Sequence, residues 1–359
     1  MQTALWNGQL VWAQTEAKKA QRTYRCPDCG QKVHLCQGTD HRPYFAHYAQ
    51  SRCDANETAI HQLGKQQIGR WLNQQGWPSY SEVYLPTIKQ RPDILTKIND
   101  QWAAIEFQCS PLGLTRLIER NQGYERLGIA YRWFLGPTYA HRLQPGKAAQ
   151  FLQWHHQQLI LPFWNLKRQQ PDYQKRRLFG LKSGKSRQDV WQILIWQTQQ
   201  LQRQIRLATP RLCELANQTY LMGHGAISTC PLVAHDTHFQ WSLMNETPLE
   251  WRISVILRLE QCPAHQCWNW PAWYDFLNQS ANWLPLPCLS DLQVEQVRHR
   301  SLACYTQELN LAGVIRYQQQ VVELIQPPRW FSSYERKLAY LEKLAAAKES
   351  AVLIDDVYH

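Results

Sequence analysis

The sequence predicts an α/β protein with three domains and a linker, and three observations support this division. A Cys-Pro-Asp-Cys motif at residues 26–29 marks a small N-terminal module. Between about residues 55 and 140, apolar residues follow helical and strand periodicities in the order helix, three strands, helix, strand. Helical patterns dominate the sequence from about residue 188 onward. We therefore expect four consecutive segments: a module at 1–54, an α/β core at 55–140, a linker at 141–187 and a mostly helical domain at 188–359.

Composition narrows the classes of function. The 359 residues include 39 Lys and Arg against 28 Asp and Glu, which favours a polyanionic partner such as nucleic acid. No apolar run approaches the roughly 18 residues that a membrane span needs. The N-terminus lacks the pattern of an export signal, and its Asn7-Gly8 pair predicts a hairpin instead. Eleven cysteines, an odd number, then favour reduced thiols or metal ligands and a cytoplasmic location.

The N-terminal module contains half of a predicted structural zinc site. Cys26 and Cys29 form a CxxC knuckle. The alternative is a redox CxxC or buried thiols, but a redox CxxC is expected beside a βαβ pattern, which does not surround this motif. The second half of the site has four candidates, namely His47 and Cys53, with His41 and Cys36 as competitors.

The first helix of the core is expected from about Ala55 to Gln75. Glu57, His61 and Lys65 are spaced four residues apart, so they form one row at the edge of the apolar stripe. Such a row is either a solvated face or a metal ligand, a proton carrier and a cation directed at one sheet. Both interpretations stay open at this point.

The chemistry is expected in the stretch from Arg91 to Ser110, which predicts two strands around a tight turn. Apolar residues alternate on both sides of Asn99-Asp100, and this pair is typical of a two-residue hairpin loop. Counting outward from the turn gives two opposed pairs, Asp93 with Glu106 and Arg91 with Gln108.

Opposed residues share a face of the hairpin, with Cβ atoms about 5 Å apart. The carboxylates of Asp93 and Glu106 could therefore hold one divalent cation. Without a cation they would repel each other, and one of them would be driven to take up a proton. The alternative is a surface hairpin with ordinary charges. Apolar residues on both faces of the second strand argue against that alternative, because a buried carboxylate needs a partner.

The rest of the core completes the predicted order. A strand is expected at Tyr80–Leu85, a helix from Ser110-Pro111 to about Leu127, and a last strand at Ile129–Leu135. On this helix, one row suited to phosphate contact is formed by Arg116, Arg120 and Tyr124. A merely solvated row of this kind is at least as common.

The C-terminal half carries weaker signals. Residues 167–187 hold eight Lys or Arg and one acid, which predicts a mobile basic linker that is either a DNA-binding arm or a solubilising hinge. The candidate phosphate contacts in this linker are Lys175, Arg176 and Arg177. Helices are expected from about 189 and near 248–261, 291–310 and 333–348. The aromatic-rich segment from Cys262 is either core or a surface that stacks on unpaired bases.

Five motifs in order carry a resemblance to known proteins: CPDC, YFAH, RPD, IEFQCS, and the Arg120 and Tyr124 pair followed by RWFLG. With the αβββαβ order, they resemble the restriction-endonuclease-like core of PD-(D/E)XK nucleases. More narrowly, the sequence resembles the CoiA family of competence proteins from transformable bacteria. The resemblance covers residues 1 to about 140 and extends loosely beyond.

The resemblance implies an active site. Asp93 and Glu106 would bind Mg²⁺ or Mn²⁺, and Glu57 and His61 would complete the site. Gln108 stands where many relatives carry a lysine. A neutral amide can orient a water but supplies no positive charge, so the cationic role would fall to Arg91 or Lys65. In the N-terminal module, Tyr44 stands where the family motif has its first His, which leaves His47 with Cys53 as the best fourth zinc ligand.

The expected function is therefore that of a metal-dependent deoxyribonuclease that processes incoming or recombining DNA during competence for natural transformation. Its substrate would be single-stranded or branched DNA, and the family connection implies work alongside the RecA recombinase. The alternative is a DNA-binding recombination accessory factor that no longer cuts. Gln108 keeps this alternative open.

Overall fold

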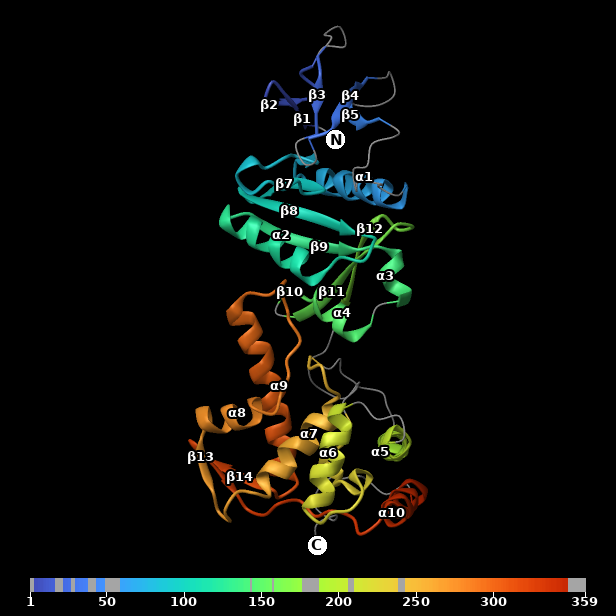
Figure 1. Ribbon diagram of the computed structural model, residues 1–359, viewed down its shortest axis with the longest axis vertical. Coiled ribbons are helices and arrows are strands. Elements are labelled where there is room, and N and C mark those ends of the chain that lie inside the picture. Colours follow the sequence, from blue (N-terminus) through green and yellow to red (C-terminus); the bar gives the residue numbers. More distant parts are fainter. Residues whose placement is uncertain are drawn as a thin grey trace. The chain divides into compact units, whose positions relative to one another are not determined.

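The computed structural model describes residues 3–16, 22–26, 30–37, 43–48, 59–142, 144–156, 158–175, 187–205, 210–237 and 243–347. The chain forms two compact units (Figure 1). Unit 1 comprises Met1–Lys175 together with Leu286–Leu289, and unit 2 comprises Arg176–Pro285 and Ser290–His359. Within the described ranges, every helix is too short or too polar to cross a membrane.

Unit 1 begins with a five-stranded antiparallel sheet in the order β2-β1-β3-β4-β5. The predicted Asn7-Gly8 hairpin is confirmed, since both residues have positive φ and join the first two strands. The sheet surrounds a small apolar cluster that includes Tyr24 and Phe45. Its strands are β1 (Thr3–Trp6), β2 (Gln9–Trp12), β3 (Tyr24–Arg25), β4 (Lys32–Cys36) and β5 (Tyr44–His47).

The core of unit 1 follows the predicted order of helix, three strands, helix and strand. Strand β8 lies centrally in the sheet, antiparallel to β7 and parallel to β9, and β6 pairs with the outer edge of β7. The α/β prediction is thus confirmed in its coarse form. The elements are α1 (Ala59–Gln74), β6 (Ser79–Ser81), β7 (Ile94–Ile98), β8 (Gln101–Gln108), α2 (Leu114–Arg126) and β9 (Ala130–Leu135).

Two predicted boundaries in this core are wrong. The strand expected at Tyr80–Leu85 ends at Ser81, because Glu82 takes a left-handed conformation (φ 52°) that interrupts the ladder. The second helix starts at Leu114 instead of Ser110. The Ser110 hydroxyl accepts a bond from the side chain of Gln108, and Gly113 occupies the N-cap position.

The sheet extends into the range where a linker was expected. Residues as far as Lys175 form ordered elements, so the predicted linker range of 141–187 is too wide, and residues 176–186 lie outside the described part of the chain. Strand β11 runs parallel to β9 and antiparallel to β10 and β12, which gives seven strands in all. The added elements are α3 (Pro137–Arg142), α4 (Pro145–Ala149), β10 (Gln153–His155), β11 (Gln158–Asn165) and β12 (Gln170–Lys175).

The two faces of this sheet are covered by different elements. Helix α1 packs Ile68 and Leu72 against a cluster that contains Ile105 and Phe107. On the other face, Tyr124 of α2 packs in a cluster with Ala104. Alternate residues of β8 therefore point to α1 and to α2, and both faces of the strand are buried as the sequence predicted.

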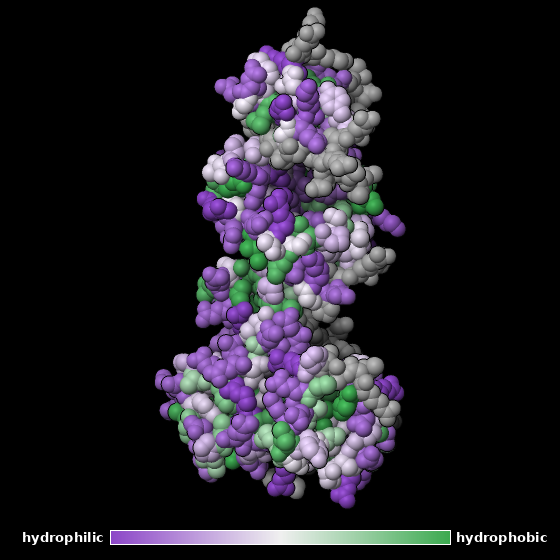
Figure 2. Space-filling model, in the orientation of Figure 1, coloured by the Kyte–Doolittle hydropathy of each residue, from purple (hydrophilic) through white to green (hydrophobic). Residues whose placement is uncertain are grey.

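Unit 2 is mostly helical, as expected. The four predicted helices are present as α5 (Arg187–Gln204), α7 (Pro248–Leu259), α9 (Asp291–Leu311) and α10 (Tyr334–Ala347). The aromatic segment supplies much of its core, with Trp273 completely buried. Figure 2 shows a mostly hydrophilic face with small separate hydrophobic patches. The remaining elements are α6 (Pro210–Leu221), α8 (Trp270–Asn278) and a small sheet of β13 (Cys267–Asn269), β14 (Ile315–Gln318) and β15 (Val321–Leu324).

Candidate active site

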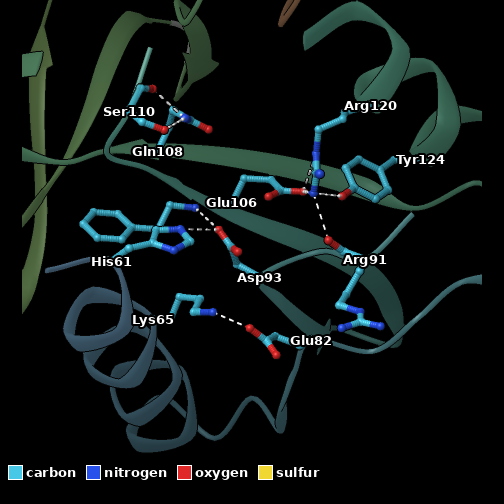
Figure 3. A network of polar contacts seen from close by, with 11 residues as sticks. His61, Lys65, Glu82, Arg91, Asp93, Glu106, Gln108, Ser110, Arg120 and Tyr124 are labelled. Carbon is cyan, nitrogen blue, oxygen red and sulfur yellow. Dashed lines mark hydrogen bonds and ion pairs between the residues drawn. The ribbon is translucent and has the colours of Figure 1, made fainter. Parts of the chain in front are cut away.

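The β7–β8 hairpin has the predicted register. Asn99 and Asp100 both have positive φ, at 46° and 64°, as a two-residue hairpin loop requires. The ladder runs outward from Ile98 opposite Gln101 to Ile94 opposite Ile105. The next residues outward are Asp93 and Glu106. The turn thus places the two carboxylates side by side at the end of the ladder, as Figure 3 shows.

Asp93 is held by one of its two oxygens. Its Oδ2 accepts a bond from the backbone N–H of Phe107 at 2.8 Å and lies 3.2 Å from Nε2 of His61. Burial raises the pKa of Asp93, but His61, the nearby Lys65 charge and the Phe107 N–H outweigh burial and lower it overall. Asp93 is therefore kept ionised.

Helix α1 brings His61 to the site because it lies very close to β8. A Cβ at Gly64 would be 2.0 Å from the ring of Phe107, so only glycine allows this approach. The His61 ring stacks on the same Phe107 ring, with centroids 5.7 Å apart and planes 6° from parallel. His61 and Lys65, the two described members of the predicted row, therefore point at the sheet and are not on a solvated face.

Glu106 is also held by one oxygen, on the α2 side. Its Oε1 accepts bonds from the Arg120 guanidinium and the Tyr124 hydroxyl. Arg120 also donates to the carbonyl of Arg91 at 2.9 Å. Burial raises the pKa of Glu106; the charge of Asp93 adds to this effect, and Arg120 and Tyr124 only partly offset it. The opposite pKa directions of Asp93 and Glu106 are those expected of two close carboxylates without a cation.

Each carboxylate keeps one oxygen for a further partner. Among the described residues, no donor bonds Oδ1 of Asp93 or Oε2 of Glu106, and Figure 3 shows the two side chains adjacent. Mg²⁺ is usually bound by one or two carboxylates, with waters and substrate oxygens completing its shell. The donor set therefore fits such an ion. No group of three or more His, Cys, Asp or Glu side chains suited to a metal occurs in the described ranges.

A second ion pair lies beside Asp93. Lys65 of α1 is almost fully buried and its Nζ is 2.5 Å from Oε1 of Glu82. Burial raises the pKa of Glu82, the Lys65 charge is the largest of the effects that lower it, and the pKa falls overall to about 2. The N–H of Glu82 donates to the carbonyl of Asp93 at 3.0 Å. Sequence reasoning missed Glu82, since nothing in the strand-like run YSEVYL signals a left-handed residue.

The other predicted site residues have different surroundings. Gln108 turns to Ser110, donating to its carbonyl at 2.6 Å and to its hydroxyl at 3.3 Å. The Arg91 guanidinium lies over the ring of Tyr84 at 5.9 Å. Arg116 is exposed and pairs with Glu119 at 3.3 Å. Arg120 and Tyr124 share the predicted row with Arg116, but their polar atoms face Glu106, so their contact with a phosphate stays a prediction.

Several predicted residues lie outside the described part of the chain: Cys29, Cys53, Glu57, Arg176, Arg177 and the side chain of Lys175. Of the zinc candidates, Cys26 is almost fully buried, and His47 lies opposite Val33 in β5. The zinc site therefore stays a prediction.

Comparisons with known proteins give two family-model matches, one after the other along the chain. Residues 57–203 match the family model of the competence protein CoiA nuclease-like domain, and residues 11–56 match that of the CoiA N-terminal domain. A relative, the competence protein CoiA of Bacillus subtilis (strain 168), is 33% identical over 130 residues, which covers 35% of this chain and 35% of that protein. No solved structure matches the chain. Both matched models come from one family and follow its order along the sequence, so the chain belongs to the competence protein CoiA family.

Proposed function

We propose that this chain is a metal-dependent deoxyribonuclease that processes DNA during natural transformation, with Asp93 and Glu106 as the ligands of Mg²⁺ or Mn²⁺. The observation that carries the proposal is the pair of adjacent carboxylates, each fixed through one oxygen and each with its other oxygen available. Two such groups in a buried site cost free energy unless a cation joins them. The nuclease-like family model covers this whole hairpin.

The protein groups around the pair have separate roles in this proposal. Arg120 and Tyr124 fix the orientation of Glu106, and His61 does the same for Asp93, which is the usual task of residues that surround metal ligands. A divalent ion bound there would supply positive charge at the scissile phosphate and make a water a better nucleophile. Glu57, four residues before His61, is the further ligand that the family resemblance implies.

The positive charge that many relatives draw from a lysine has one well-placed candidate. Gln108 is directed at Ser110, and the guanidinium of Arg91 lies over Tyr84. Lys65 lies beside Asp93 and lowers the pKa of this carboxyl group. We assign the cationic role to Lys65, with Glu82 fixing its position.

A second candidate function is that of a DNA-binding recombination accessory factor without nuclease activity. The observation that favours it is the commitment of Gln108 to Ser110, because an amide held in this way does not replace a lysine. In either case the proposed nucleic-acid ligand is single-stranded or branched DNA, the proposed partner is the RecA recombinase and the proposed compartment is the cytoplasm.

One assay separates the two functions. The full chain is incubated with end-labelled single-stranded, duplex and branched DNA in Mg²⁺, in Mn²⁺ and in EDTA. A nuclease gives products only with a metal. Binding without any product in either metal would refute the nuclease and support the accessory factor.

A further inference from the structure

Arg132 of β9 carries a positive charge that no described residue neutralises. Its side chain is half-buried, and its Nη1 is fully buried without a hydrogen-bond partner. Within the described ranges, the guanidinium makes neither a hydrogen bond nor an ion pair. Burial lowers the pKa of Arg132, although the group remains a cation at any physiological pH.

Two aromatic side chains of the same sheet, His155 of β10 and Tyr173 of β12, are near enough for the charge of Arg132 to act on their pKa. His155 of β10 and Tyr173 of β12 have ring centroids 4.7 Å apart, and the ring of His156 is 4.1 Å from that of His155. Burial lowers the pKa of His155, and the charge of Arg132 lowers it further, so the two groups are close. The Arg132 guanidinium and the Tyr173 hydroxyl can donate hydrogen bonds, and so can each imidazole through its protonated nitrogen.

No acid on the surrounding strands faces Arg132. Strands β9, β10 and β11 contain no Asp or Glu, and the single acid of β12, Asp172, is exposed and adjacent to Tyr173, so it points to the opposite face. The Cys288 thiol is also near, but burial raises its pKa to about 12 and keeps it neutral. A half-buried cation that bonds no carboxylate among the described residues is costly unless an anion binds.

The chemistry of this cluster identifies the anion. A guanidinium fork matches the geometry of phosphate oxygens, and unit 1 is strongly basic, with 21 Lys and Arg against 12 Asp and Glu between residues 1 and 175. We propose that Arg132, with His155 and Tyr173, binds a backbone phosphate of the nucleic acid on which this chain acts. This inference rests on the proposed function only in that the ligand is DNA.

The proposed phosphate site is separate from the catalytic carboxylates. Arg132 pairs with Ile105, the residue before Glu106, so it lies on the neighbouring strand. Its side chain shares the sheet face of Ile105 and Phe107, whereas Glu106 faces α2. Arg132 would therefore hold a phosphate other than the scissile one and act on DNA affinity more than on the cutting step.

The test is the salt dependence of DNA binding by the full chain in EDTA, where no cutting occurs. Arg132→Gln should weaken binding of a labelled single-stranded oligonucleotide about 10-fold and reduce the slope of log Kd against log salt by about 0.7, the value of one phosphate contact. Arg132→Lys should keep the slope and lose part of the affinity. Arg316→Gln removes the same charge from an exposed position in unit 2 and should change neither.

Thermal unfolding provides a second readout. Inorganic phosphate should raise the Tm of the native protein and of Arg316→Gln more than that of Arg132→Gln. An unchanged slope and Kd in Arg132→Gln would overturn the proposal. Stabilisation by phosphate that needs Arg132, together with unchanged DNA binding, would show a site for a free anion and also refute it. Binding in EDTA does not depend on cleavage. The phosphate-site proposal can therefore be refuted by these measurements whether or not the chain proves to be a nuclease.

Discussion

Replacing Asp93 by Asn tests the proposed catalytic pair most directly. The amide oxygen can still accept the 2.8 Å bond from the Phe107 N–H, whereas the contact with His61 loses its charge assistance. The cost in folding free energy should be about 1 kcal/mol, or a Tm shift of roughly 2–4 °C. Mutation of a residue that only supports a metal ligand typically lowers metal affinity or activity by about 10- to 100-fold. Loss of a ligand itself should therefore slow cleavage by at least about 100-fold.

The assay compares cleavage of labelled single-stranded and branched DNA with Mg²⁺ and with Mn²⁺. Asp100→Asn is the matched control: it makes the same change in the same hairpin, at a side chain that is 95% exposed and pairs with Lys97 at the surface. The double variant with Glu106→Gln should be hardly slower than either single variant, because residues that act as a unit are not additive. Cleavage by Asp93→Asn at the native rate in both metals would refute the assigned site.

Three further predictions concern other parts of the chain. Cys29→Ser should lower both bound zinc and Tm, and metal analysis that finds no zinc in the native protein would contradict the site. Changing Lys175, the last residue of β12, together with Arg176 and Arg177 to Ala should reduce the salt slope of DNA binding by up to roughly three contacts, and an unchanged slope would identify a solvated hinge. Glu82, with a pKa near 2 when folded, should stabilise the protein above pH 4.5 and lose this effect as pH falls toward 2. Urea unfolding in EDTA should thus show Glu82→Gln less stable than the native protein by up to roughly 3 kcal/mol at pH 7, with a smaller difference at pH 3.

The hairpin could be predicted because its geometry is local. A two-residue loop fixes the register, and the register fixes which side chains oppose each other, so Asn99-Asp100 was enough to pair Asp93 with Glu106. The helix row was less informative. Spacing alone puts Arg116, Arg120 and Tyr124 in line, but only the packing of α2 shows that two of them face Glu106.

The second half of the sheet could not be predicted for a different reason. Strand β11 contains Pro162, which argues against a strand in the middle of a sheet. The structure accommodates Pro162 where β11 changes neighbours, between the residues paired with β10 and Phe163, which pairs with β9. Beside β9, the side chain of Gln153 replaces the missing backbone partner. Its amide oxygen accepts a bond from the Trp133 N–H, and its amide nitrogen donates one to the Trp133 carbonyl. No local pattern signals such a long-range replacement of ladder bonds.

The charges around Asp93 and Glu106 indicate how this proposed catalytic pair would respond to a cation. Without one, Arg120 is the main positive charge at Glu106, and Lys65 is shared between Glu82 and the neighbourhood of Asp93. All described donors bond to one oxygen of each carboxylate, Oδ2 of Asp93 and Oε1 of Glu106. An ion could therefore bind the other two oxygens without displacing Arg120, Tyr124 or His61. Arg120 would then act as a positioning residue in both states and would not be released to contact DNA. The proposed DNA contacts are accordingly sought elsewhere on the chain, first at Arg132, whose Nη1 has no hydrogen-bond partner among the described residues.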